Sequence, residues 1–216
     1  MTGASPVRKR SGVASYRARR RRAMVAEVRR QGVTDPRVLR AMLEVPRHRF
    51  VPAHLADEAY GPGPLPIACG QTISAPAMVG AMAALLELTG RERVLEVGTG
   101  SGYAAAVLSR CAREVISIEY HPSLAAGARA ALAATGHHVE VRHGDGRAGA
   151  PDKAPFDAIS VAAMAEGEVP AALLGQLTDR GVLVCPVGHG RRGDLVRMRR
   201  DGRVERFMPV SFVPLL

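Results

Sequence analysis

Apolar and polar positions alternate along the second half of the chain in a rhythm that predicts strands and helices in turn. Short apolar runs are typical of buried strands, and apolar residues at helical spacing lie between them. The strands are expected at 93–97, 114–119, 138–142, 156–161 and 182–186, and the helices at 103–111, 123–135 and 169–177. Strands that alternate with helices form βαβ units, so we expect a doubly wound α/β fold: a mostly parallel sheet of seven strands with helices on both faces.

The end of the chain breaks this rhythm. Residues 194–199 and 203–207 flank Asp201-Gly202, a dipeptide that favours a tight hairpin turn. We therefore expect an antiparallel hairpin after the parallel strands. A doubly wound sheet finished by such a hairpin resembles the domain of methyltransferases that use S-adenosylmethionine (SAM).

The first half of the chain predicts helices joined by irregular segments. Residues 17–31 favour a helix, and Asp35-Pro36 is typical of the start of a second one, with Asp35 as N-cap. A connection rich in proline and glycine follows, and 71–88 begins as a loop that becomes an apolar helix. We divide the chain into a flexible basic arm (1–22), a helical segment with a substrate and active-site loop (23–90) and a cofactor-binding core (91–216).

The net charge of +10 is concentrated at the N-terminus. Residues 1–30 contain ten Lys and Arg residues and one acid, whereas the other 186 residues contain 20 basic and 19 acidic ones. Such an arm is typical of a solvated tail, or of a segment that contacts nucleic acid or an acidic polypeptide. Tyr16 is the only aromatic residue among these arginines, which argues against a segment that stacks on nucleic-acid bases.

The remaining composition excludes several classes of protein. The chain has no apolar run of about 18 residues, so we expect no contact with a membrane. Its three cysteines are far apart, and no set of His, Cys and carboxylate has the spacing of a zinc site. We expect a cytoplasmic monomer with reduced thiols and no metal.

Residues 94–103 predict a cofactor turn between a strand and a helix. Glycines at 98, 100 and 102 let the backbone adopt positive φ and approach a ligand. A dinucleotide fingerprint would have its third glycine at 103, where Tyr103 stands. Glu96 could receive the ammonium of SAM and would repel a pyrophosphate. The predicted cofactor contacts in this stretch are Glu96, Gly98, Thr99, Gly100, Ser101 and Gly102.

Two later strand ends carry further groups for the same ligand. Glu119 follows Gly98 by 21 residues, a spacing that suits the ribose hydroxyls. Asp145 follows the next strand and could accept a hydrogen bond from an adenine amino group. Because ligands of such folds bind at the carboxyl ends of strands, the three ends together predict a SAM site. Tyr120 and Gly146 are included among its contacts.

Upstream, Pro-Leu-Pro-Ile-Ala-Cys-Gly-Gln-Thr-Ile-Ser at 64–74, followed by Val-Leu-Glu-Val-Gly-Thr-Gly-Ser-Gly-Tyr at 94–103, resembles the protein-L-isoaspartate (D-aspartate) O-methyltransferase family. Residues 45–52, 144–146, 155–157 and 212–215 extend the resemblance over about 23–216. It implies methyl transfer from SAM to the free carboxylate of an L-isoaspartyl residue in a peptide or protein, with S-adenosylhomocysteine as the other product. It also implies that Ser74 is the active-site serine, that Gln71, Thr72 and Ile73 line the SAM pocket, and that Val213, Pro214 and Leu215 lie near the peptide.

This chemistry requires no general base, because the acceptor carboxylate is already ionised at neutral pH. The hydroxyl of Ser74 could donate one hydrogen bond that aligns the acceptor oxygen. Ser74 also precedes Ala75-Pro76 and an apolar helix, so it could instead cap that helix, and the two roles could coexist.

The chain departs from the family pattern near the expected substrate mouth. Gly61 stands where an acid is common, Ala77 where Tyr or His is common, and Ala162-Ala163 where Thr-Ala is common. These changes motivate one alternative: methylation of an Asp in a dedicated, ribosomally made peptide, which would mature to an aspartimide. A second alternative is a nucleic-acid methyltransferase. The absence of a base-methylation motif after the fourth strand argues against it.

Overall fold

Ten strands and six α-helices make up the described part of the chain. The computed structural model describes residues 6–216, with side chains described from Ala14 onward. The helices are α1 (Pro6–Arg30), α2 (Pro36–Glu44), α3 (Pro76–Leu85), α4 (Tyr103–Ser109), α5 (Pro122–Ala134) and α6 (Ala171–Gly175). The strands are β1 (Leu65–Pro66), β2 (Thr72–Ile73), β3 (Arg93–Val97), β4 (Glu114–Glu119), β5 (Glu140–His143), β6 (Phe156–Val161), β7 (Ala165–Glu166), β8 (Leu177–His189), β9 (Arg192–Arg199) and β10 (Val204–Ser211).

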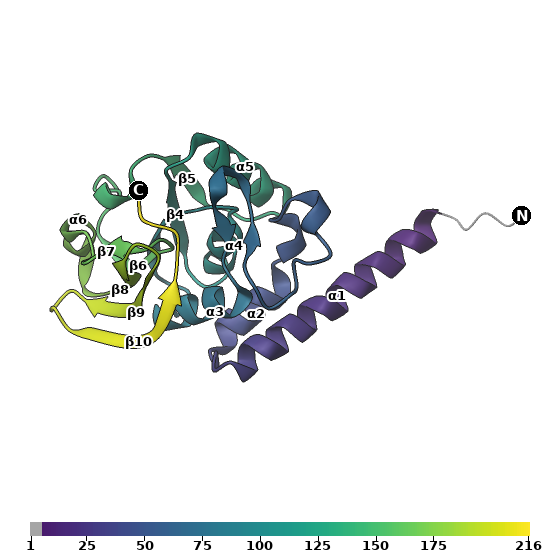
Figure 1. Cartoon of the computed structure of the whole chain (residues 1–216), viewed down its shortest axis with the longest axis horizontal. Helices are drawn as coiled ribbons and strands as arrows, with labels where there is room; N and C mark the ends of the chain where they lie inside the picture. Colours follow the sequence, from purple (N-terminus) through teal and green to yellow (C-terminus); the bar gives the residue numbers. More distant parts are fainter. Residues whose placement is uncertain (1–5) are drawn as a thin grey trace, which may run out of the picture.

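The main sheet follows the order β10-β9-β8-β6-β3-β4-β5, and the two-residue β7 pairs with β8 beside this path (Figure 1). The pairs β3–β4, β4–β5, β3–β6 and β6–β8 are parallel, whereas β8–β9 and β9–β10 are antiparallel. The predicted parallel sheet and its C-terminal hairpin are confirmed. Gly202 has a φ of +87°, and Arg199 donates its N–H to the carbonyl of Arg203, so Asp201-Gly202 forms the turn.

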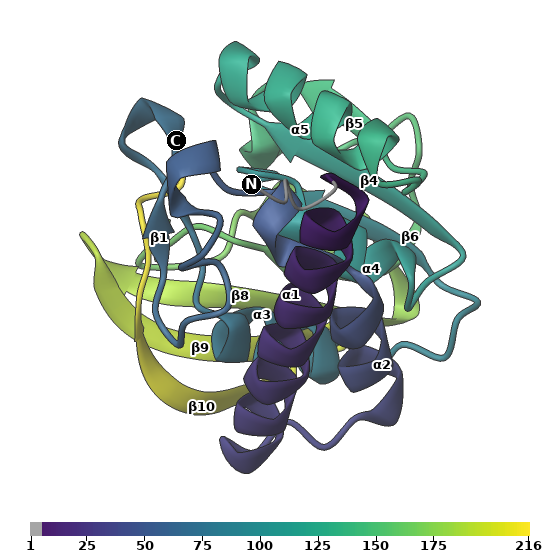
Figure 2. The same ribbon diagram turned by 90° about the vertical axis from the view of Figure 1, so that its right-hand side faces the viewer.

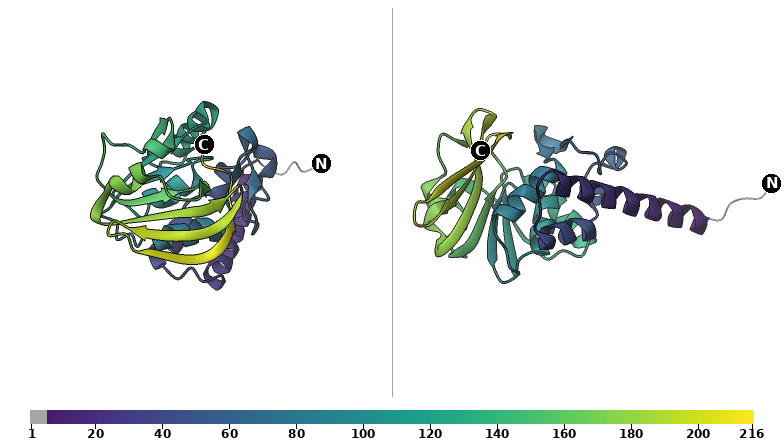
Figure 3. Two further views of the ribbon diagram at one scale, coloured as in Figure 1. Left: turned by 60° about the vertical axis from the view of Figure 1, so that its left-hand side comes forward. Right: turned by 90° about the horizontal axis from the view of Figure 1, so that it is seen from below.

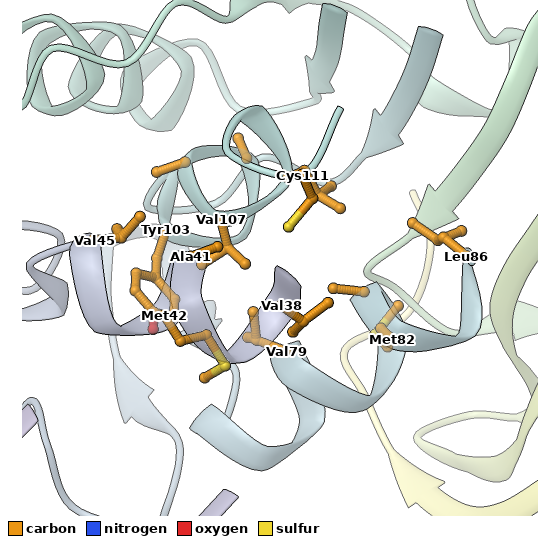
Figure 4. Close-up of a cluster of buried hydrophobic side chains, with 14 of the residues drawn as sticks. Val38, Ala41, Met42, Val45, Val79, Met82, Leu86, Tyr103, Val107 and Cys111 are labelled. Atoms are coloured by element: carbon orange, nitrogen blue, oxygen red, sulfur yellow. The ribbon is translucent and has the colours of Figure 1, made fainter. Parts of the chain in front are cut away.

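Two hydrophobic cores lie on opposite faces of this sheet. The larger one packs α1 to α5 against one face, and Figure 4 shows its central side chains, including Met42, Val79 and Val107. The smaller one includes Leu173 of α6 and Val169 on the opposite face. Leu95 and Ile116 face the smaller core, whereas Val94 and Val115 face the larger one, as expected for strands buried on both sides.

Helix α1 runs through the predicted boundary at residue 22 without a break. Its N-terminal part stands clear of the body, and its C-terminal part lies against α2 and α3 (Figures 1, 2 and 3). Met24, Val25 and Val28 anchor that part in the larger core. Residues 1–5 of the expected arm lie outside the described residues. No helix among those described combines the length and apolar character that a membrane span requires.

Local signals predicted some boundaries well and others poorly. Asp35 caps α2 as expected: its Oδ1 accepts hydrogen bonds from the N–H groups of Arg37 and Val38, at 2.8 and 3.2 Å. The helix expected over 169–177 is only α6, because Pro170 precedes it and Leu177 already belongs to β8. Strand β8 extends beyond 182–186 at both ends, because Leu177 pairs with Phe156 of β6 and His189 pairs with Arg192 of β9.

Candidate functional site

A cavity opens at the carboxyl ends of the parallel strands. It lies where the strand order reverses, because the chain moves outward from β3 through β4 to β5 and then returns to β6 on the other side of β3. Its walls come from all four strand ends, from the β1–β2 hairpin and from the end of the chain. The lining residues are Gln71, Thr72, Ile73, Ser74, Val79, Val97, Gly98, Thr99, Gly100, Ser101, Tyr103, Ala104, Ile118, Glu119, Tyr120, His121, Gly146, Ala162, Ala163, Val213, Pro214, Leu215 and Leu216.

The glycine turn after β3 forms the floor of this cavity. Gly98, Gly100 and Gly102 have φ values of +91°, +54° and +86°, a region that L side chains rarely adopt. The N–H groups of Gly98 and Thr99 donate to the carbonyl of Ile118 on β4, which fixes the turn beside the next strand. The turn leads into α4, so its backbone lies at a helix N-terminus open to a polar ligand.

Glu119, at the end of β4, is tied to the turn through its carboxylate. Its Oε2 accepts a hydrogen bond from the N–H of Gly100 at 2.7 Å, and its Oε1 accepts one from the N–H of His121 at 2.9 Å. The side chain is 5% exposed and lines the cavity. Each carboxylate oxygen can accept more than one hydrogen bond, so both retain capacity for a ligand.

Glu96 lies beneath the turn, not on the cavity wall. It is fully buried, and the hydroxyl of Ser117 donates a hydrogen bond to its Oε2. The hydroxyls of Ser117 and Thr99 are 2.5 Å apart, so Thr99 connects this buried pair to the cavity. Glu96 Oε1 has no hydrogen-bond partner within the described part of the chain. Burial raises the pKa of Glu96 to about 8 despite the Ser117 hydrogen bond, and the charge of Glu119 acts in the same direction as burial.

Ser74 reaches the cavity from the opposite side, directly after the β1–β2 hairpin. Leu65 pairs with Ile73, and the tip of the hairpin turns through Cys69 and Gly70, both at positive φ. Helix α3 begins at Pro76 with Ala75 as its N-cap and without a side-chain capping bond. The interpretation of Ser74 as a helix cap is therefore wrong. Its hydroxyl has no hydrogen-bond partner among the described residues and is available to a ligand.

A buried arginine holds the Ser74 segment in place. Arg47 is fully buried; its Nε donates to the carbonyl of Ala59 and its Nη2 to the carbonyl of Ser74, each at 2.8 Å. Its guanidinium carbon lies 4.7 Å from the ring centroid of Tyr103, the first residue of α4. Burial lowers the pKa of Arg47 to about 10, so it remains a cation at neutral pH. Arg47 thus joins the Ser74 segment to the helix that follows the glycine turn.

The final residues of the chain close the cavity beyond β6. The N–H of Met164 donates to the carbonyl of Val213 at 2.7 Å, and the N–H of Leu215 donates to the carbonyl of Met164 at 2.8 Å. Ala162 and Ala163 lie beside these final residues, and the side chain of each is a single methyl group. The wall on this side is therefore apolar.

Comparison with known proteins identifies the family of this chain. The family model for protein-L-isoaspartate (D-aspartate) O-methyltransferase matches residues 19–216. The chain belongs to this family. A protein-L-isoaspartate O-methyltransferase of Methylorubrum extorquens is 52% identical over 201 residues, which cover 91% of this chain and 88% of that one. One from Roseiflexus castenholzii is also 52% identical, over 91% of each chain.

A solved structure gives the same result for the fold. A Plasmodium falciparum protein described as a protein-L-isoaspartate O-methyltransferase, crystallised with S-adenosylhomocysteine, aligns with a TM-score of 0.79. The alignment covers 91% of this chain and 98% of the other at 23% identity. The predicted methyltransferase fold is thereby confirmed.

The structure brings together most of the residues that the sequence predicts for the methyltransferase site. Gln71, Thr72, Ile73 and Ser74 face the turn residues and Glu119 across one cavity, with Tyr120, Gly146 and Val213–Leu215 on its rim. Three predicted cofactor contacts do not line it. Glu96 and Gly102 are buried below the turn, and Asp145 is turned toward Arg147, whose Nη2 donates to it at 2.8 Å.

The cavity of this methyltransferase also contains residues that are not among the predicted contacts. The Nε2 atom of His121 lies 3.4 Å from the side-chain amide nitrogen of Gln71, so His121 joins the hairpin to the end of β4. Tyr103 and Ala162 line the wall as well. The rule that ligands bind at strand ends could have found His121 and Ala162, since each lies within two residues of such an end. The part played by Tyr103 depends on its contact with Arg47, which no local pattern shows.

The burial of Glu96 predicts a pH-dependent stability in the ligand-free methyltransferase. Its folded pKa lies above the unfolded value, so its contribution is fully present below about pH 4.5 and is lost as pH rises through about 8. Urea unfolding from pH 5 to 9 should therefore show wild type losing stability relative to Glu96→Gln as pH rises. The exposed Glu168→Gln variant serves as control and should follow wild type. Parallel curves for wild type and Glu96→Gln would contradict a buried, protonated Glu96.

Proposed function

We propose that this protein transfers a methyl group from SAM to the free carboxylate of an L-isoaspartyl residue in a peptide or protein. The observation that carries the proposal is the single cavity in which Ser74 faces the glycine turn and Glu119. Family membership over residues 19–216 supports the same reaction.

The residues of the turn side fit SAM. Glu119 would accept hydrogen bonds from the ribose hydroxyls, and the backbone of Gly98 to Ser101 would follow the methionine part. Thr99 would meet the ligand directly, with Glu96 acting through Ser117 and Thr99 behind it. Bound there, SAM supplies an electrophilic methyl group and leaves as S-adenosylhomocysteine. The turn residues position that group and exclude water from it.

A close fit at Gly146 gives a direct test of the turn side. A Cβ at Gly146 would lie 2.3 Å from Cγ1 of Val97, which is buried and lines the cavity. Gly146→Ala should therefore cost about 1–3 kcal/mol of stability and weaken SAM binding. Gly144→Ala is the matched control, because no atom lies within 4 Å of a Cβ at that position. Unfolding curves and calorimetric SAM titrations measure both effects, and equal values for the two variants would refute the fit.

On the acceptor side, Ser74 donates its hydroxyl hydrogen to one oxygen of the substrate carboxylate. The carboxylate is ionised at neutral pH, so the protein needs to align it and partly remove its water, not to deprotonate it. The apolar wall of Ala162, Ala163 and Val213 suits that desolvation. The methyl ester then loses methanol when the next backbone nitrogen attacks it. That ring closure gives a succinimide and needs no further group from the protein.

The small residues at this wall favour one second candidate. Ala162 and Ala163 leave the acceptor side without polar side chains that would distinguish isoaspartate from aspartate. A protein of the same architecture could methylate an Asp in one dedicated peptide and drive it to an aspartimide. The acceptor residue, not the chemistry, separates the two candidates.

Methyl transfer to paired peptides tests the proposal. Two peptides that differ only in isoaspartate versus aspartate at one position are incubated with methyl-labelled SAM, and labelled methanol is collected. We expect turnover of the isoaspartyl peptide and little of its partner. Equal rates, or activity only on a dedicated precursor peptide, would contradict isoaspartate as the acceptor and favour the second candidate.

A further inference from the structure

A second groove lies beside the acceptor side and shares no residue with the cavity described above. It runs between α1 and the segments on either side of the active-site hairpin, and its volume is about 340 Å³. Helix α1 contributes Arg20, Ala23, Met24, Glu27 and Val28, and Gln31 follows it; the opposite wall consists of Tyr60, Gly61, Pro62, Pro76 and Ala77. Pro76 and Ala77 follow Ser74 by two and three residues. The groove therefore begins next to the acceptor site.

The shape of the groove suits a peptide segment. Gly61 and Ala77 offer little or no side chain, and Met24 and Val28 form an apolar floor. Its volume equals that of roughly ten water molecules at about 30 Å³ each, enough for a side chain or two. A separation of two to three residues corresponds to at most about 7–11 Å of extended chain. The second to fourth neighbours of a substrate residue held at Ser74 would therefore be within reach of the groove, which has room for one or two of their side chains.

The charges around the groove select the kind of segment. Among the described residues of α1, Arg19, Arg20, Arg21 and Arg22 have no carboxylate within 4 Å, whereas Arg17 pairs with Asp57 and Arg30 with Glu27. Arg20 lines the groove and donates from Nη1 to the hydroxyl of Tyr16 at 2.8 Å. The acid at the groove, Glu27, is already engaged by Arg30 and Gln31. Arg20, without a carboxylate partner, therefore gives the groove a local positive charge, and the carboxylate beside it is already partnered.

The neighbouring histidine, His48, adds no charge to the groove at physiological pH. His48 Nδ1 lies 2.7 Å from the hydroxyl of Tyr60, which lines the groove. Burial, with Arg17 and Arg21 nearby, lowers the pKa of His48 to about 4, so it is neutral at physiological pH. The positive charge in the groove therefore comes from Arg20.

We propose that this groove binds the stretch of the substrate polypeptide next to the methylated residue, and that it favours stretches containing Asp or Glu. The inference rests on the proposed function and adds a sequence preference to it. Long-range attraction to α1 would first raise the rate of encounter with acidic polypeptides. The apolar floor would then hold the neighbouring side chains.

The test compares isoaspartyl peptides of equal length with Glu, Gln or Lys at the second to fourth positions on one side of the acceptor. A second set carries the same residues on the other side. At low salt, kcat/KM of wild type should be about five- to tenfold higher for the Glu peptide than for the Gln peptide in one of the two sets, the size expected for one or two surface charge pairs. Arg20→Gln should reduce that ratio toward one, as should 0.5 M salt. Arg29→Gln, an exposed position on the same helix outside the groove, should leave it unchanged.

A variant whose larger side chain fills the groove distinguishes binding in the groove from attraction by charge alone. Ala77→Tyr should raise KM for these long peptides and leave SAM affinity unchanged, and its unfolding curve shows whether it is folded. Equal kcat/KM for Glu and Gln peptides in both sets would overturn the proposal while leaving the methyltransferase activity intact. The proposal would also be overturned if single-stranded DNA inhibited wild type but not Arg20→Gln while the peptides showed no preference for Glu over Gln. If SAM binds and no isoaspartyl peptide is methylated, the proposed function itself has failed.

Discussion

Arg47→Met is expected to lower the stability of the protein by about 2–5 kcal/mol and to lower kcat well beyond its effect on SAM binding. The substitution leaves the carbonyls of Ala59 and Ser74 without their donor, at about 1–3 kcal/mol each. It also removes the cation that stacks on Tyr103. Because the Ser74 carbonyl is one of its two anchors, the acceptor side should lose its alignment. The turn and Glu119, which Arg47 does not touch, should keep their ligand.

Two further variants make this expectation specific. Arg47→Lys keeps the charge but cannot span both carbonyls with one planar group, so its stability and kcat should lie between those of wild type and Arg47→Met. Arg49→Met removes an exposed arginine from the same 3-10 turn (η1, Arg47–Arg49) and should behave as wild type. Urea unfolding, steady-state kinetics and SAM titration measure the three effects. A stable Arg47→Met with unchanged kcat would show that the Arg47 contacts neither stabilise the protein nor align the Ser74 segment.

Ser74→Ala is expected to reduce kcat for an isoaspartyl peptide by about 10- to 100-fold. One hydrogen bond from the hydroxyl to a charged oxygen is worth about 1.5–3 kcal/mol, which corresponds to that range. Stability should change little, since the hydroxyl has no partner among the described residues and does not cap α3. The affinity for SAM should also change little, because the turn and Glu119 are intact.

The control for this variant is Ser15→Ala, which removes an exposed hydroxyl of α1 outside the cavity. Steady-state kinetics with varied peptide and fixed SAM, together with SAM titration, separate the two sides of the cavity. Unchanged kcat in Ser74→Ala would remove Ser74 from the acceptor site. A loss that appears only as weaker SAM binding would assign the hydroxyl to the cofactor instead.

The sequence predicted those parts of the fold that depend on local pattern. Apolar runs marked β3, β4 and β6 at their observed bounds, and Asp35 and Asp201-Gly202 marked a cap and a turn. It did not predict the length of β8, whose start pairs with β6 and whose end pairs with β9. It also did not predict the β1–β2 hairpin, which is held by Cys69 and Gly70 at positive φ and by contacts to residues far along the chain.

The site shows the same division between local and long-range information. Motifs singled out Ser74 and Glu119, which both line the cavity, because each lies in a segment with its own recognisable spacing. They misplaced Glu96, since spacing along a strand does not reveal that Ser117 and Thr99 lie between it and the cavity. Arg47 was not identified as part of the site, because its partners Ala59, Ser74 and Tyr103 are 12 to 56 residues away in sequence.

The most direct test of the account is a crystal structure of the protein with S-adenosylhomocysteine and an isoaspartyl peptide bound. We expect the acceptor carboxylate to lie within roughly 3 Å of the Ser74 hydroxyl, with the ribose hydroxyls on Glu119. The peptide should leave that point toward Pro76 and α1. A peptide carboxylate more than about 4 Å from Ser74, or a nucleoside bound away from the turn at Gly98 to Gly102, would contradict the central claim.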